Sequence, residues 1–190
     1  MDTKTTYVTV DTNLYQDPVI IELGRGLPYL HIYATKITED EAGREVIMGS
    51  QVGSWMWGEH MWGDNPFVPN KALPRVFTIG SSTIGGEDRI APDGKGTDFL
   101  QAILDITTTG SVKYLRDLHS PHHGILNSIN DAKILQIHCI HNFHIFVSND
   151  TKFIGKPGTP KRHQLEQLSG TRIMTADEFK AIYLAHIPST

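Results

Sequence analysis

Four acidic side chains occupy positions in this sequence that suit hydrolytic chemistry. Asp11 follows the β-branched and aromatic run Tyr7–Val10, and Asp150 follows a second such run, so each is expected directly after a strand. Glu41 and Asp131 each stand fourth in a pattern that begins with Thr or Ser, which predicts a place in the first turn of a helix. In an open parallel sheet, strand ends and the starts of the following helices lie at one edge. We therefore expect the four carboxylates to converge on one crevice.

Four clustered carboxylates would repel one another unless a divalent cation neutralised them. Ligation by oxygen alone suits Mg²⁺ or Mn²⁺ better than Zn²⁺. Such an ion activates a water nucleophile and stabilises the leaving oxygen when a phosphodiester is cleaved in line. The hydroxyls of Thr12 and Ser148 stand close in sequence to two of the acids, where they would orient a carboxylate or a metal-bound water.

Taken singly, each acid also has a structural interpretation. Asp11 and Asp150 suit turns at strand ends, and Glu41 and Asp131 suit helix capping. The agreement of all four favours a shared metal site, which we take as the hypothesis to test.

A basic stretch follows directly after Asp150. Residues 151–164 contain no acid, and their cations are Lys152, Lys156, Lys161 and Arg162. Positive charge beside a hydrolytic site suits a nucleic-acid backbone, although the stretch taken alone also suits a solvated loop. The 190-residue chain has 17 Lys plus Arg against 21 Asp plus Glu, a formal charge of −4. This balance argues against a uniformly basic nucleic-acid coat, but it is compatible with an acidic nuclease site beside a local basic patch.

Strands and helices are expected to alternate along the chain. The predicted strands cover residues 7–10, 29–34, 144–148 and 172–174, and predicted helices begin at Thr38, Ser128, Pro160 and Thr175. An irregular helix with Pro18 in its middle is expected between the first two strands. This alternation predicts a single α/β domain over residues 1–190, with three α/β/α layers around a mostly parallel sheet.

Residues 48–124 differ from the rest, because glycine and proline are frequent there. We predict a loop-rich insertion with helical segments at 98–106 and 112–118. Its aromatic and methionine cluster favours a local core or a protein-binding surface over base stacking. The cluster consists of Trp55, Met56, Trp57, Met61 and Trp62.

The histidines and the single cysteine suggest structural roles. His138, His141 and His144 recur every third residue, but they cross an expected helix-to-strand junction and no second thiol is available, so a zinc site is disfavoured. Cys139 permits no internal disulfide and is interpreted as a small buried side chain. The sequence has no secretory signal and no apolar run near the roughly 20 residues that span a bilayer, so we expect a cytoplasmic protein without membrane contact.

In their order and spacing, these segments resemble the PIN-domain nucleases, which include the toxins of many bacterial toxin–antitoxin pairs. The similar segments are 7–13, 37–41, 130–135, 147–150 with Phe153, and 170–179. The resemblance implies a PIN-like three-layer fold and an endoribonuclease dependent on Mg²⁺ or Mn²⁺, which leaves a 5′-phosphate and a 3′-hydroxyl. Its acids would be Asp11, Glu41, Asp131 and Asp150.

The resemblance also implies an RNA substrate, an antitoxin protein as partner, and a homodimer. Glu39, Asp40 or Glu45 would replace Glu41 if the helix register shifts. Segment 48–124 is much longer than the connection that the family usually has there. Two alternatives remain open: a non-catalytic PIN-like module that binds RNA or protein, and a nuclease directed at DNA.

Overall fold

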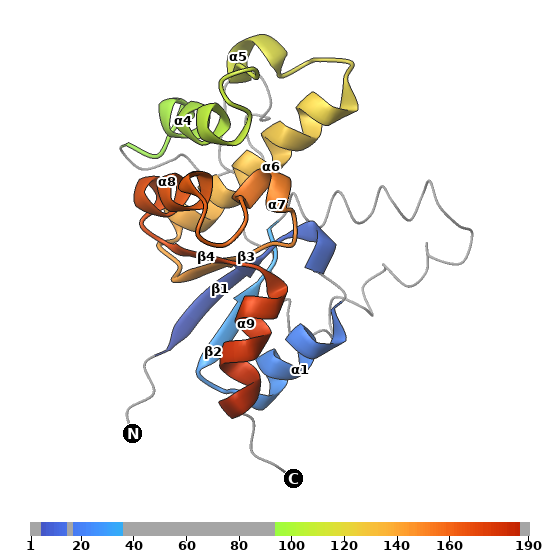
Figure 1. Cartoon of the computed structure of the whole chain (residues 1–190), viewed down its shortest axis with the longest axis vertical. Helices are drawn as coiled ribbons and strands as arrows, with labels where there is room; N and C mark the ends of the chain where they lie inside the picture. The colour runs from blue at the N-terminus through green and yellow to red at the C-terminus, as the bar shows by residue number, and fades with distance from the viewer. Residues whose placement is uncertain (1–4, 15–16, 36–93, 187–190) are drawn as a thin grey trace, which may run out of the picture.

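The structure is a computed structural model, and it describes residues 5–14, 17–35 and 94–186 (Figure 1). Within these ranges the chain forms a four-stranded sheet in the order β2-β1-β3-β4, with every neighbouring pair parallel. The strands are β1 (Thr6–Val10), β2 (Leu30–Tyr33), β3 (Ile145–Val147) and β4 (Arg172–Met174). The predicted α/β class and parallel sheet are confirmed.

Helices pack against both faces of this sheet (Figure 1). One face is covered by α1 (Pro18–Gly26) and α9 (Ala176–Tyr183), and the other by α4 (Thr97–Thr107), α6 (His123–Ile140), α7 (Thr151–Ile154) and α8 (Pro160–Ser169). Three short elements complete the described chain: η1 (Thr12–Leu14), α5 (Tyr114–Asp117) and η2 (Leu184–His186). Among the described helices, none has the length and apolar character needed to cross a membrane.

The alternation of side chains along the strands divides the apolar core into two layers. Val8 and Val10 of β1 pack with the residues of α1 and α9, whereas Phe146 and Ile173 pack with α4, α6 and α8. All four side chains are buried. The sheet is therefore held between two apolar layers, and its strand ends are free to carry polar residues.

Helix α1 begins at Pro18 rather than containing it. Asp17 is the N-cap, and its Oδ1 accepts hydrogen bonds from the N–H groups of Val19 (3.0 Å) and Ile20 (3.2 Å). Proline suits the first helical position because the N–H that it lacks would have no helical partner there. The expectation of an irregular helix with Pro18 in its middle is therefore wrong.

Helix α6 begins at His123, five residues before the predicted start at Ser128. The Ser128 hydroxyl donates to the carbonyl of Gly124 at 3.0 Å, a bond that a serine inside a helix makes to the preceding turn. Asp131 consequently lies midway along the 18-residue helix. Its predicted place in a first turn is wrong.

The described part of segment 48–124 contains both predicted helices, α4 and α5. Helix α4 buries Phe99, Leu100, Ile103 and Leu104 in the same apolar layer as α6. The part of this segment from Phe99 to Leu118 thus contributes to the core. The predicted helix start at Thr38, the candidate acids at 39–45 and the tryptophan cluster at 55–62 lie outside the described residues.

Strand β4 is the last strand of the described sheet, and side chains close its outer edge. Ile173 directs its backbone N–H and C=O away from β3. The N–H donates to Glu166 Oε1 at 3.0 Å, and the C=O accepts from Arg162 Nη1 at 3.2 Å. Both outward polar groups of this edge are therefore satisfied without a further strand.

We expect Glu166→Ala to lower the free energy of unfolding by about 1–2 kcal/mol, because the part-buried Ile173 N–H loses its acceptor. The same change should increase aggregation, since it exposes an edge group. Urea unfolding and light scattering measure the two effects. Glu166→Gln keeps an acceptor oxygen and is the control. Equal stability of the wild type, Glu166→Ala and Glu166→Gln would show that the Glu166 hydrogen bond does not stabilise this edge.

Candidate functional site

The carboxyl ends of β1 and β3 are adjacent in the sheet, and the chain leaves these two strands toward opposite faces. Asp11 N–H donates to the carbonyl of Val147 at 3.0 Å, so the residues following the two strands are held together. The β1-to-β2 connection runs through α1 on one face, and the β3-to-β4 connection runs through α8 on the other (Figure 1). Such a switch point is where open α/β sheets bind ligands.

Asp11 lies at this switch point and is only 4% exposed. Its Oδ1 accepts from Thr12 N–H at 2.7 Å, and its Oδ2 accepts from the Ser148 hydroxyl at 2.6 Å and from Asn13 Nδ2 at 3.3 Å. The carboxyl group is the acceptor in all three contacts. Asp11 is therefore a buried carboxyl group whose orientation is fixed by hydrogen bonds.

Ser148 connects Asp11 to Asp150. Its buried hydroxyl donates to Asp11 and accepts from Asp150 N–H at 3.0 Å. Asp150 is the N-cap of α7, where its Oδ1 accepts from the N–H groups of Lys152 (2.8 Å) and Phe153 (3.2 Å). Among the described residues, Asp150 Oδ2 accepts no hydrogen bond. This oxygen is the one that remains for a ligand.

Two asparagines that sequence reasoning did not select complete the network. Asn149 N–H donates to Asn13 Oδ1 at 3.4 Å, and Asn149 Oδ1 accepts from Ala176 N–H at 3.0 Å. They tie η1 and the start of α9 to the end of β3. The signal that could have found them is their position beside the two acids, in Asp-Thr-Asn and Ser-Asn-Asp.

Asp131 lies in the middle of α6 and is partly exposed. Helix α6 ends at Ile140, before β3 begins at Ile145.

Of the four predicted acids, Asp11 and Asp150 are the two that hydrogen bonds join through Ser148. Glu41 lies outside the described residues. Within residues 5–14, 17–35 and 94–186, no three or more His, Cys, Asp or Glu side chains form a group that could hold a metal ion. A metal site at this edge would therefore be built first on Asp11 and Asp150, which Ser148 connects through the Asp11 carboxylate and the Asp150 backbone N–H.

Arg162 is a structural residue, which corrects the expectation that it faces a nucleic-acid backbone. It is 4% exposed, and its guanidinium donates to Glu178 Oε2 at 2.8 Å and to the carbonyl of Gly155 at 2.8 Å. Burial raises the pKa of Glu178, but hydrogen bonds from Thr175 N–H and Arg162 lower it overall. The guanidinium holds α8 to α7 and α9 from within the protein.

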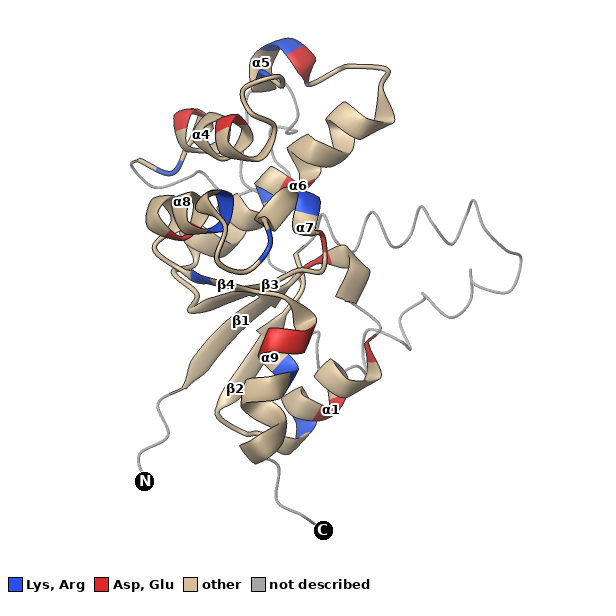
Figure 2. Ribbon diagram, in the orientation of Figure 1, with Lys and Arg blue, Asp and Glu red and all other residues tan. Residues whose placement is uncertain are grey.

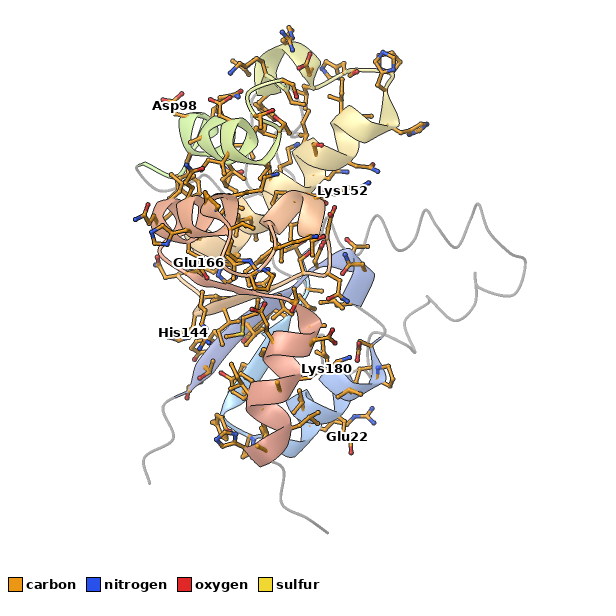
Figure 3. The ribbon with its side chains drawn as sticks, in the orientation of Figure 1. Glu22, Asp98, His144, Lys152, Glu166 and Lys180 are labelled. Atoms are coloured by element: carbon orange, nitrogen blue, oxygen red, sulfur yellow. The ribbon has the colours of Figure 1, made fainter. Side chains whose placement is uncertain are left out.

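The three lysines of the basic stretch differ in availability. Lys161 Nζ donates to the carbonyls of Thr107 (2.8 Å) and Lys152 (2.7 Å), so it joins α8 to α4 and α7. Lys152 and Lys156 are exposed, and Figure 3 shows Lys152 on α7 directed outward. These two side chains are the members of the stretch that remain available for a substrate.

His138 and Cys139 have the expected structural roles. His138 is fully buried with Nε2 2.7 Å from Thr171 Oγ1, and burial, helped by the charges of His141 and Lys95, lowers its pKa to about 3. Burial raises the pKa of the Cys139 thiol to about 12. The imidazole is therefore neutral and the thiol protonated at neutral pH.

The buried imidazole predicts a loss of stability in mild acid. The unfolded chain protonates His138 near pH 6.5, whereas the folded protein does so near pH 3, so the unfolded state binds more protons between these values. We expect the protonation of His138 in the unfolded state to lower the free energy of unfolding by about 1.4 kcal/mol per pH unit as the pH falls below 6.5. Urea unfolding between pH 7.5 and 5 measures this slope. His138→Gln should flatten it, and an unchanged slope in that variant would contradict the prediction.

No family model, curated protein or solved structure matches this chain.

Proposed function

We propose that the protein is a metal-dependent endoribonuclease that hydrolyses RNA phosphodiester bonds at the carboxyl edge of β1 and β3. The observation that carries the proposal is the position of Asp11 and Asp150 at the switch point, where the Ser148 hydroxyl hydrogen-bonds to the Asp11 carboxylate and the Asp150 backbone N–H. Carboxylates at the same sheet edge repel one another, and a divalent ion with a substrate phosphate would relieve this repulsion.

The donor set fits Mg²⁺ or Mn²⁺ because all of its ligating atoms are oxygens. Asp11 and Asp150 would hold the ion, with Glu41 as a further acid. In the part of the chain that the structure describes, Asp131, on α6, forms no group of three with them that could hold a metal ion. Mg²⁺ commonly binds proteins through one or two carboxylates and keeps several waters. When bound, the ion would supply an activated water and stabilisation of the leaving oxygen.

The protein's own residues preorganise this edge. The Ser148 hydroxyl and the Thr12 N–H fix the Asp11 carboxylate, so it needs no reorientation when a substrate arrives. The N–H groups at the start of α7 hold Asp150 through its Oδ1. The position of Oδ2 is fixed as a result. Ser148 orients Asp11 with its hydroxyl, whereas Thr12 does so with its backbone N–H rather than with the hydroxyl that the sequence suggested.

A nucleic acid is the proposed class of substrate because exposed cations follow Asp150 in the sequence, and the choice of RNA rests on the sequence resemblance. Lys152 follows Asp150 by two residues, and Lys156 lies on the same connection to α8 (Figure 2). These lysines would contact phosphates and position the strand without reading its sequence. The PIN-like assignment, a role as toxin with an antitoxin partner and a homodimer belong to the same proposal and rest on the sequence resemblance. A cytoplasmic location is proposed with them.

A cleavage assay on a fluorescent single-stranded RNA tests the proposal. We expect cleavage with Mg²⁺ or Mn²⁺, none with EDTA, and products that carry a 5′-phosphate. RNA binding without turnover would favour the non-catalytic alternative. A DNA strand of the same sequence is the matched substrate control, because only RNA offers a 2′-hydroxyl. Equal cleavage of both strands would favour a nuclease directed at DNA.

A further inference from the structure

One side of β1 and β2 carries ring side chains. The aliphatic residues of these strands pack toward α1 and α9, so the alternating residues Tyr7, His31 and Tyr33 face the opposite side. Among the described elements, β2 packs closely against β1 and α1, whereas α8 packs on β4 at the far end of the sheet. On the side of β2 opposite α1, Tyr33 packs against the apolar layer that contains α4 and α6, and His31 is exposed.

Five rings form a continuous surface there, which we call the ring face: Tyr7, His31, Tyr33, Phe143 and His144. Tyr7 is at its centre, with its centroid 5.4 Å from the rings of Phe143 and His31 and 5.8 Å from that of His144. The Tyr7 ring is nearly parallel to those of Phe143 (19°) and His144 (12°). His31 and His144 are exposed, and the other three rings are partly exposed.

His144 offers a fixed polar group on this surface. Its Nδ1 accepts from Tyr7 N–H at 3.0 Å, so the proton of the neutral imidazole is on Nε2. Figure 3 shows His144 at the outside of the sheet, beside β1. The ring face therefore combines flat aromatic surface with an outward N–H donor.

We propose that the ring face binds the bases of single-stranded RNA; that the strand is RNA rather than DNA rests on the proposed function. Every base can stack on an exposed ring, and base edges provide acceptors for an imidazole N–H. The segments that build the face, 5–8, 28–34 and 136–145, contain no Asp or Glu, so they add no negative charge to repel a phosphate backbone.

The exposed members of the ring face favour a nucleic acid over an apolar protein surface. They are the imidazoles of His31 and His144, which can both stack and hydrogen bond. Along β1, Tyr7 precedes Asp11 by four residues, or about 13 Å. Thr9, which lies between them on the same side of β1, is fully buried, so the ring face and Asp11 are not joined by an exposed path along this strand.

Fluorescence anisotropy with a labelled single-stranded oligonucleotide tests the ring face on the full chain. The titration is done in EDTA, so that binding is measured without cleavage. We expect His31→Ala to weaken binding at least about fivefold, because one stacking contact is lost. His31→Phe keeps a ring and should retain most of the affinity. His186→Ala removes an exposed histidine on η2, which follows α9, and should bind as the wild type does.

A second variant, Tyr7→Leu, should also weaken binding, since it removes the central ring while keeping apolar volume. Unchanged affinity in both His31→Ala and Tyr7→Leu would overturn the proposal. The proposal would also be overturned if the wild type bound no single-stranded oligonucleotide and instead self-associated through His31. The ring face would then be an interface between two copies of the chain.

The ring face and the nuclease activity can fail separately. If His31→Ala loses affinity in EDTA and the wild type does not cleave RNA with Mg²⁺ or Mn²⁺, the ring face stands and the proposed nuclease activity fails. If the wild type cleaves RNA and both variants bind it unchanged, the nuclease activity stands and the ring face fails.

Discussion

Asp150→Asn is expected to lower metal-dependent RNA cleavage by at least about 10³-fold without unfolding the protein. The substitution removes a negative charge from the switch point but keeps a side-chain oxygen for the N–H groups of Lys152 and Phe153. Asparagine caps helices about as well as aspartate does, so α7 should keep its start. The loss of activity would then come from the missing charge.

Asp11→Asn should lose as much activity, with some loss of stability. Asp11 accepts from three donors, so an amide places one N–H against another donor and should cost about 1–2 kcal/mol. Initial rates on fluorescent RNA and circular dichroism measure the two effects. Asp98→Asn removes an exposed acid from the first turn of α4 and is the matched control, with full activity expected. Full activity in both Asp11→Asn and Asp150→Asn would show that the two acids are not part of the catalytic site.

Arg162→Met is expected to lower the free energy of unfolding by about 2–4 kcal/mol, because it leaves buried acceptors without donors. The guanidinium bonds to the carbonyls of Gly155 and Ile173 and to the partly exposed Glu178, whose exposure reduces the cost. Arg162→Lys should recover little of this, since an ammonium cannot reach all three directions at once.

Lys152→Ala is the contrasting variant from the same basic stretch. Because Lys152 is exposed, its removal should leave the urea midpoint unchanged while weakening RNA binding and reducing the salt dependence of that binding. If Arg162→Met were as stable as the wild type and lost RNA affinity instead, the structural role of Arg162 would be contradicted.

The local part of the fold could be predicted from the sequence because its signals are short. Thr175 and Glu178 form the predicted capping box at the start of α9, and Pro160 is the first residue of α8. Ser128 was misleading because a serine hydroxyl can satisfy the preceding helical turn as readily as it caps a new one. Nothing in the sequence around residue 128 distinguishes the two uses.

The candidate site was predictable to the extent that strand ends determine it. Asp11 and Asp150 follow parallel strands, so their proximity follows from the sheet alone. The role of Arg162 depends on Glu178, which lies beyond the next strand, and a charged residue has the same sequence signature whether it is paired in the interior or solvated. The same limit applies to Asn149, whose contact with Ala176 is tertiary.

A calorimetric titration with Mn²⁺ tests the central claim most directly, because it measures the site without a substrate. We predict that the wild type and Asp98→Asn bind Mn²⁺ alike, and that Asp11→Asn and Asp150→Asn each bind it at least about tenfold more weakly. Equal Mn²⁺ affinity in all four proteins would contradict a metal site at the carboxyl edge of β1 and β3.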